Sequence, residues 1–190
     1  MPVNLLPYHW ETERLVVQDS TLDEAPDLQQ VVDAIPEIHG WTCASERDEP
    51  DRPVLSVLME PPLPPNGSKE LFRMQSIRVR DTGLLIGLLT TYHGFPTADV
   101  FWVNTFAVHP AFQGKGYGPE AICGLSDTVM QLGPYTRMQL FACLENWRAL
   151  RFWAKAGFDR IVEIRGDKMH SAQAEAHVLL EKSLSGKSAQ

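Results

Sequence analysis

Residues 109–122, HPAFQGKGYGPEAI, constrain the fold of this chain more than any other stretch, because they place three glycines within five positions. Residues 99–108 before the stretch have the apolar character of a buried strand, and the residues after it, through Leu132, have the spacing of a helix. A glycine turn between a strand and a helix leaves main-chain N–H groups free and points them, with the positive end of the helix dipole, at one place. The stretch therefore predicts an α/β fold with an anion site, and a diphosphate is the expected anion.

Two common phosphate-binding patterns do not match this loop. The dinucleotide pattern G-x-G-x-x-G fails because the sixth position from Gly114 is Pro119. The P-loop pattern fails because Tyr117 follows Gly116 where lysine is required, and the later GKS has Glu181 in place of the first glycine. Both kinds of nucleotide-binding fold are therefore disfavoured, and a glycine turn that binds no ligand remains an alternative.

The rest of the chain alternates between strand and helix signals. Strands are expected at residues 13–18, 71–80, 84–93, 99–108, 137–143, 160–165 and 176–184. Helices are expected at residues 21–34, at 54–59, from the glycine loop through 132, and from 146 to just before 157. This order predicts an α/β fold with a mixed, largely antiparallel central sheet flanked by helices. Residues 1–184 are expected to form one domain, and residues 185–190 a flexible tail.

Charge and cysteine content limit the partners of the chain. The net charge is −7, whereas binding to nucleic-acid phosphates requires clustered Lys and Arg, so no nucleic-acid partner is expected. The acidic surface suits a cationic partner, or simply keeps the protein soluble. Cys43, Cys123 and Cys143 form no metal-binding pair and are expected to be reduced thiols in a cytoplasmic protein that holds no metal. No signal peptide and no apolar run near ~20 residues is present, so no membrane partner is expected.

Two motifs resemble those of the GNAT superfamily of N-acetyltransferases. Gln113, Gly116 and Gly118 match Gln/Arg-x-x-Gly-x-Gly/Ala, the loop that binds the pyrophosphate of acyl-CoA in that family. Residues 146–158, NWRALRFWAKAGF, resemble the family's Asn-x-x-Ala/Ser-x-x-apolar-x-x-Lys-x-Gly-Phe helix. More narrowly, GKGYGPEAI and the early TERL, residues 12–15, are similar to the branch of ribosomal-protein N-terminal alanine acetyltransferases.

The resemblance implies where acetyl-CoA binds. In this family the strand before the loop and the strand after the next helix splay apart, and pantetheine lies between them against the main chain of the first strand. A main-chain N–H near Phe106 would polarise the thioester carbonyl. Asn146 would hydrogen-bond pantetheine, cap its own helix, or do both. The implied binding residues are Phe106, Ala107, Val108, Gln113, Gly114, Lys115, Gly116, Tyr117, Gly118 and Asn146.

The catalytic groups are less well matched. Transfer to an amine needs a base, and Asp99 is the nearest carboxylate to the strand before the loop, although it could equally cap the turn that precedes it. His93, His109 and Asn104 are weaker candidates. Many relatives protonate the departing thiolate with a tyrosine seven residues after the motif asparagine, and this chain has Trp153 there.

Since an indole cannot donate its proton in this role, Tyr117, Cys123 or water is expected to take the place of the tyrosine. The acceptor site is expected to form from the first helix and its acidic loop, residues 36–52, and from residues 166–175. In the loop, Glu46, Asp48, Glu49 and Asp51 would suit a cationic amine or form a solvated surface. Trp10 and Trp41 would line this site or pack at the edge of the core.

The resemblance as a whole implies an enzyme that moves an acetyl group from acetyl-CoA to a primary amine by direct attack. The acceptor is a small molecule or a protein N-terminus, and homodimers are common in the family. The alternative is a module or sensor that binds acyl-CoA without catalysis, which Trp153 and the absence of a carboxylate within residues 100–108 make plausible.

Overall fold

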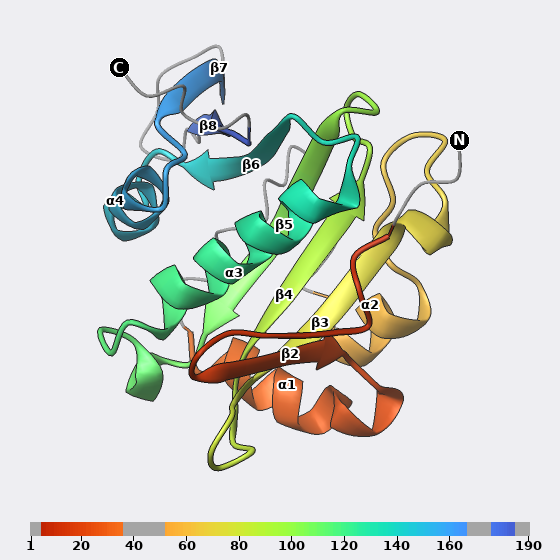
Figure 1. The fold of residues 1–190 in the computed structure, drawn as a ribbon, viewed down its shortest axis with the longest axis vertical. Helices are drawn as coiled ribbons and strands as arrows, with labels where there is room; N and C mark the ends of the chain where they lie inside the picture. Colours follow the sequence, from red (N-terminus) through yellow and green to blue (C-terminus); the bar gives the residue numbers. More distant parts are fainter. Residues whose placement is uncertain (1–4, 36–51, 167–175, 185–190) are drawn as a thin grey trace.

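The computed structural model describes residues 5–35, 52–166 and 176–184. These residues form one eight-stranded sheet in the order β1-β2-β3-β4-β5-β6-β8-β7 (Figure 1). All neighbouring strands are antiparallel except β5 and β6, which are parallel. The mixed α/β fold and the largely antiparallel sheet predicted from the sequence are therefore confirmed.

The elements lie close to their predicted positions. The strands are β1 (His9–Glu11), β2 (Leu15–Asp19), β3 (Phe72–Val79), β4 (Leu85–His93), β5 (Val100–Val108), β6 (Arg137–Cys143), β7 (Arg160–Gly166) and β8 (Ala176–Ser183). The helices are α1 (Ala25–Asp33), α2 (Val54–Met59), α3 (Tyr117–Leu132) and α4 (Trp147–Lys155). A 3₁₀ turn at Leu22–Glu24 precedes α1, where the Thr21 N–H donates to the Glu24 carboxylate as the capping pattern predicts.

The first strand, β1, has no counterpart among the predicted strands. It is three residues long, too short for an alternating pattern to stand out. Its place is fixed instead by pairing with β2, where Trp10 lies opposite Val17, and by the hydrogen bond of 2.9 Å from the Trp10 indole to the Gln75 side chain. Trp10 is 7% exposed and packs in the core, which decides between its two expected roles in favour of packing.

Two layers of helix cover the sheet (Figure 1). On one face α3 and α4 enclose a core to which Ile122, Leu125 and Phe158 contribute. On the other face α1 and α2 pack on a smaller core around Leu28 and Leu88. We call these the α3 face and the α1 face of the sheet. None of the helices in the described ranges is both long and apolar enough to cross a bilayer.

Strands β5 and β6 pair over only part of their length. Pairing runs from Val100 opposite Arg137 to Trp102 opposite Gln139 and then stops, although β5 continues to Val108. At the same point the pairing of β5 with β4 skips Asn104, so this residue forms a β-bulge. A bulge bends its strand and increases the local twist, which turns β5 away from β6. The two strands therefore diverge in the middle of the sheet.

Several expected acceptor-site residues cannot be placed. Residues 36–51 and 167–175, with Trp41, Cys43 and the acidic side chains Glu46, Asp48, Glu49 and Asp51, lie outside the described residues, as does the expected tail at 185–190.

Candidate functional site

A cleft of about 380 Å³ opens where β5 and β6 diverge. Residues 102–106 of β5 and 140–143 of β6 line its walls, and Asn146 and Trp153 of the α4 region close one end. Beyond Trp102, the main-chain edge of β5 that faces β6 has no strand partner within the described part of the chain. The cleft thus offers a row of main-chain donors and acceptors next to the N-terminus of α4.

The glycine loop leads from β5 into α3. Gly114 has a φ of 76° and Gly116 a φ of 85°, and residues other than glycine rarely adopt such backbone angles. At Gly118 the constraint is space, because an added Cβ would lie 3.1 Å from the Phe152 ring. Within the described residues, the main-chain N–H groups of residues 114–118 donate no hydrogen bond. Free N–H donors at the positive end of a helix dipole are the groups that an anion binds, so the loop has the donors that the expected anion site requires.

Gln113 fixes the start of the loop. Its side-chain Nε2 donates to the Val108 carbonyl oxygen at 2.6 Å, and its Oε1 accepts from the Arg148 guanidinium. This arrangement brings Arg148 of α4 beside the loop, where its positive charge adds to the attraction for an anion. Lys115 extends over the Phe112 ring at 5.1 Å and remains exposed.

Arg14 is a loop contact that sequence analysis missed. Its Nη1 donates to the Lys115 carbonyl oxygen at 3.1 Å, its Nε donates to Glu120 at 2.6 Å, and its guanidinium lies 4.7 Å from the centre of the Tyr117 ring. Burial raises the pKa of Glu120, but hydrogen bonds from Thr12 and Arg14 outweigh burial and hold that pKa below its ordinary value. Arg14 is the third residue of TERL, which served only as a sign of family resemblance. Nothing in that stretch indicates that Arg14 contacts the glycine loop.

Asn146 and Trp153 both reach the cleft. The Asn146 Oδ1 accepts from the Ala149 N–H at 2.9 Å and so caps α4, while its Nδ2 has no partner in the described part of the chain. Trp153 is 8% exposed and lies 5.9 Å from the Phe106 ring, which stacks on Phe152 at 5.6 Å. This aromatic cluster packs α4 against β5 below the cleft.

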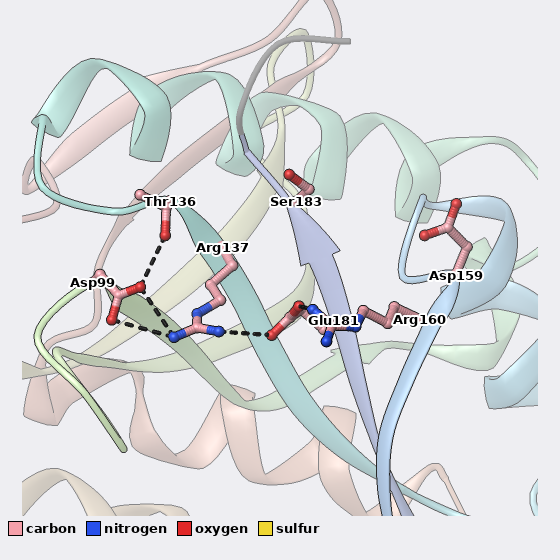
Figure 2. A pocket seen from close by; sticks show the side chains of 7 residues that line it. All are labelled: Asp99, Thr136, Arg137, Asp159, Arg160, Glu181 and Ser183. Atoms are coloured by element: carbon pink, nitrogen blue, oxygen red, sulfur yellow. Dashed lines mark hydrogen bonds and ion pairs between the residues drawn. The ribbon is translucent and has the colours of Figure 1, made fainter.

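Asp99 directly precedes β5 and is not among the residues that line the cleft; it lines a separate pocket with Thr136, Arg137 and Glu181 (Figure 2). It accepts hydrogen bonds from Thr97 at 2.6 Å and Thr136 at 2.9 Å, and it is paired with Arg137 at 3.1 Å. These contacts, led by the Thr97 hydrogen bond, lower the pKa of Asp99 to about 2. Such a carboxylate is a weak base, and it is not among the described residues that line the cleft.

The Asp99 contacts belong to a chain of charges that ties four strands together. Figure 2 shows Arg137 between the carboxylates of Asp99 and Glu181, and Arg160 on the far side of Glu181. Glu181 is 4% exposed and accepts from Arg160 at 2.7 Å and from Gln139 at 2.6 Å. The pairs join β5 to β6, β6 to β8 and β8 to β7 at the end where β5 and β6 are still paired. We call Asp99, Arg137, Glu181 and Arg160 the strand clamp, because they join the strands at the end where β5 and β6 pair, opposite the end where these two strands diverge.

The two histidines considered as bases have structural partners. His93 is fully buried; its Nε2 accepts from the Leu6 N–H at 3.3 Å and its Nδ1 lies 2.7 Å from the Tyr135 hydroxyl. Burial, with a smaller contribution from the Arg73 charge, lowers the pKa of His93 to about 4. His109 caps the turn before the loop by accepting from the Ala111 N–H at 3.2 Å.

The two described cysteines are free thiols in different places. Cys143 lines the cleft, whereas Cys123 is exposed on α3 and is not among the residues that line the cleft. Asn104, the bulge residue, is exposed in the cleft, and Tyr117 lies in the first turn of α3 under Arg14. Among the described residues, no group of three or more His, Cys, Asp or Glu side chains is arranged to hold a metal ion.

Solved structures share this fold. A probable acetyltransferase of the GNAT family from Chromobacterium violaceum matches with a TM-score of 0.75 and 12% identity over 96% of this chain and 89% of its own. A ribosomal-protein-S5-alanine acetyltransferase from Vibrio fischeri matches with a TM-score of 0.66 and 15% identity over 95% and 98%. A spermidine N-acetyltransferase chimera of Vibrio cholerae and human sequences matches with a TM-score of 0.64 and 13% identity over 91% and 97%.

At these identities the likeness shows the fold alone, and no curated protein matches the sequence significantly. The family model is more specific. Residues 47–158 match the model described as the acetyltransferase (GNAT) family, and this match extends from before β3 to the end of the α4 motif. It therefore includes the glycine loop, both strands of the cleft and Asn146. Because the match covers more than half of the 190 residues, the chain belongs to the GNAT acetyltransferase family.

Proposed function

We propose that this protein transfers an acetyl group from acetyl-CoA to a primary amine by direct attack within a ternary complex. The observation that carries the proposal is the divergence of β5 and β6 at the Asn104 bulge, immediately before a loop with unpartnered main-chain N–H groups. An elongated ligand with a diphosphate at one end and an amide-rich chain at the other suits this combination of loop and open strand edge.

The residues of the loop and of β5 divide the binding of acetyl-CoA between them. Residues 113–118 form the pyrophosphate loop, in which residues 114–118 offer free main-chain N–H groups. The Gln113 N–H already donates to the Pro110 carbonyl, and its side chain holds the Arg148 charge beside the loop. Pro119 has no N–H and contributes none. Phe106 lines the cleft and offers main-chain groups to pantetheine, and Ala107 and Val108 continue the same strand, although the Val108 carbonyl is already bound by Gln113. The free Nδ2 of Asn146 donates to pantetheine.

The chemistry depends on a neutral amine and on stabilisation of the oxyanion. An amine with a pKa near ~10.4 is neutral in only about one molecule in 2,500 at pH 7, so its proton has to leave before attack. No carboxylate or histidine is among the described residues that line the cleft, and the proton therefore passes to water. A main-chain N–H of β5 near Phe106 donates to the oxyanion that forms when the amine attacks the thioester carbon.

A second function has one observation in its favour. Trp153 occupies the position of the usual proton donor, and the described lining of the cleft holds no titratable acid or base apart from Cys143. A protein that binds acyl-CoA as a sensor needs neither group. We favour direct transfer, because the CoA thiolate leaves without a protein side chain to protonate it and because water accepts the proton of the amine.

Titration with acetyl-CoA by calorimetry tests the binding site. We expect the wild type to bind and Gly116→Glu to lose binding, since Gly116 has a φ of 85° and its added Cβ would lie 3.0 Å from Arg14. Gly133→Glu is the matched control, because Gly133 also has a positive φ, of 105°, and lies at the other end of α3 with open space around it. A wild type that does not bind at millimolar acetyl-CoA contradicts the proposal.

Thiol release with a panel of amines then separates the enzyme from the sensor. An enzyme releases CoA faster with an amine than by hydrolysis alone, whereas a sensor binds acetyl-CoA without this acceleration. A cytoplasmic location agrees with the free thiols of Cys123 and Cys143. Homodimer formation stays a prediction, which sedimentation checks.

A further inference from the structure

The cleft has two aromatic walls, which belong to opposite faces of the sheet. Phe106 and Trp153 pack with the core on the α3 face, whereas Trp102 packs with the core on the α1 face. The Phe141 ring lies at 70° to the Trp102 ring with the centroids 5.4 Å apart. All four residues line the cleft, so the cleft connects the two faces. We call Trp102 and Phe141 the acceptor wall, because it lies opposite the wall that is built on α4.

We propose that the acceptor carries its primary amine next to an aromatic ring, and that this ring packs against the acceptor wall. The proposal rests on the acetyl transfer proposed above and names the class of amine that the same site takes. The ring would occupy the α1 face of the cleft and leave the amine pointing toward the thioester between the strands.

The acceptor wall is preorganised for a flat apolar group. Phe95 lies edge to face with Trp102 at 5.3 Å, so three rings in a row hold one another in place. Trp102 and Phe141 are both partly exposed, and Pro62 adds a further apolar surface beside them. Aromatic pairs prefer offset or edge-to-face contacts at centroid distances of about 4.5–7 Å, a geometry that a ligand ring can extend.

The charges around the acceptor wall disfavour a polycation. The described lining of the cleft contains no aspartate or glutamate. The Arg165 guanidinium lies 5.2 Å from the centre of the Phe141 ring, so that face of the ring is already occupied by a cation. Glu163, the nearby carboxylate on β7, is bound to both Nε and Nη2 of Arg165 at 2.8 Å. A ligand with several ammonium groups would therefore meet the Arg165 charge and no carboxylate among the described residues that line the cleft.

The test compares amines as acceptors for the 190-residue chain. The probes are 2-phenylethylamine, hexylamine as an aliphatic amine of similar size, and spermidine as a polyamine. We expect kcat/KM for 2-phenylethylamine to exceed that for either other probe by about tenfold, the scale of one to two aromatic contacts. Trp102→Leu and Phe141→Leu should remove this preference, by lowering kcat/KM for 2-phenylethylamine about tenfold more than kcat/KM for hexylamine. Tyr8→Leu, which removes an exposed ring that neither lines the cleft nor contacts the acceptor wall, is the matched control.

Binding is also measured without turnover, by calorimetric titration of each amine into the protein saturated with CoA. If no amine accelerates thiol release, the proposed transfer fails, but tighter binding of 2-phenylethylamine, lost in the two wall variants, still supports the acceptor wall. If spermidine or hexylamine binds as well as 2-phenylethylamine in the wild type, the inference is overturned. Equal losses for all amines in the wall variants overturn it as well.

Discussion

Asp99 Oδ2 lies 3.1 Å from the Arg137 guanidinium, at the closed end of the two strands that diverge to form the cleft. This pair joins the start of β5 to β6 and lies outside the cleft in which we propose that acetyl transfer takes place. We therefore expect Asp99→Asn to retain kcat/KM within about threefold, whereas loss of a general base typically costs 10² to 10⁴. Steady-state kinetics of thiol release checks this, and a loss of a hundredfold would make Asp99 the base after all.

The same variant should show a pH-dependent loss of stability. Because the pKa of folded Asp99 is lowered to about 2, its contribution is present above the ordinary pKa of 3.8 and is lost as the pH falls toward 2. The pair is partly exposed, so the cost at pH 7 is at most about 1 kcal/mol, or roughly 2–4 °C in Tm. Thermal melts at pH 7 and pH 3 should show a smaller difference at pH 3, and a constant difference would contradict the assigned contacts.

Glu181 is the central member of the strand clamp and should matter more than Asp99. Glu181→Ala leaves Arg137 and Arg160 without their shared carboxylate and Gln139 without its acceptor. Breaking a buried ion pair typically lowers the free energy of unfolding by about 3–5 kcal/mol. Because the two arginines are partly exposed, we expect a loss of about 3 kcal/mol. Urea unfolding measures it. Glu163→Ala, which breaks an exposed pair with Arg165, is the control and should leave the free energy of unfolding almost unchanged.

Arg14 should affect the pyrophosphate end of the ligand alone. Arg14→Ala removes the hydrogen bond to the Lys115 carbonyl and the contact with the Tyr117 ring, so the loop loses its fixed shape. We expect the Kd of acetyl-CoA to rise about tenfold, while that of S-acetylpantetheine, which lacks the diphosphate, changes little. Arg80→Ala, on an exposed arginine paired with Glu11, is the control. Equal losses for both ligands would show that Arg14 acts on the cleft as a whole.

The secondary structure was largely predictable because it depends on local periodicity. The alternation in residues 71–80 and the capping pattern at Thr21 act over a few residues, and both lie where the sequence indicated. The glycine loop was found for the same reason, since the requirement for a positive φ at Gly114 and Gly116 is local. Strand β1 was missed because three residues carry too little pattern.

The parts that sequence could not supply depend on long-range pairing. The bulge at Asn104 appears only in the register between β4 and β5, and the end of pairing at Trp102 appears only between β5 and β6. Asp99 was favoured as the base because it is the nearest carboxylate to β5 in the sequence. However, Asp99 precedes the first residue of β5, and the two ends of an extended strand lie far apart. Arg14 lies 101 residues before Lys115, and only the fold brings the two together.

The rate at which Cys143 is alkylated should show whether acetyl-CoA occupies the cleft. Cys143 lines the cleft and is partly buried, whereas Cys123 lies exposed on α3. Saturating acetyl-CoA should slow alkylation of Cys143 by iodoacetamide at least about tenfold and leave Cys123 within twofold. Mass spectrometry of the separate peptides resolves the two thiols. If both were protected equally, the ligand would act on the whole fold, and if Cys143 stayed reactive, pantetheine would not lie between β5 and β6.

His93 should make the protein less stable as the solution becomes acidic. Its pKa is about 4 in the folded chain and near 6.5 when unfolded, so between these values only the unfolded state takes up the proton. Above pH 6.5 His93 therefore does not reduce the free energy of unfolding, and this free energy falls by about 3 kcal/mol as the pH drops to 4. Each unit of difference between the folded and unfolded pKa values contributes about 1.36 kcal/mol. His93→Gln removes this titration. The free energy of unfolding, measured in urea at pH 7 and pH 4.5, should fall more steeply in the wild type than in the variant by about 2–3 kcal/mol. Parallel decreases would mean that the buried imidazole, with Nε2 accepting from Leu6 and Nδ1 beside Tyr135, is protonated in the folded state.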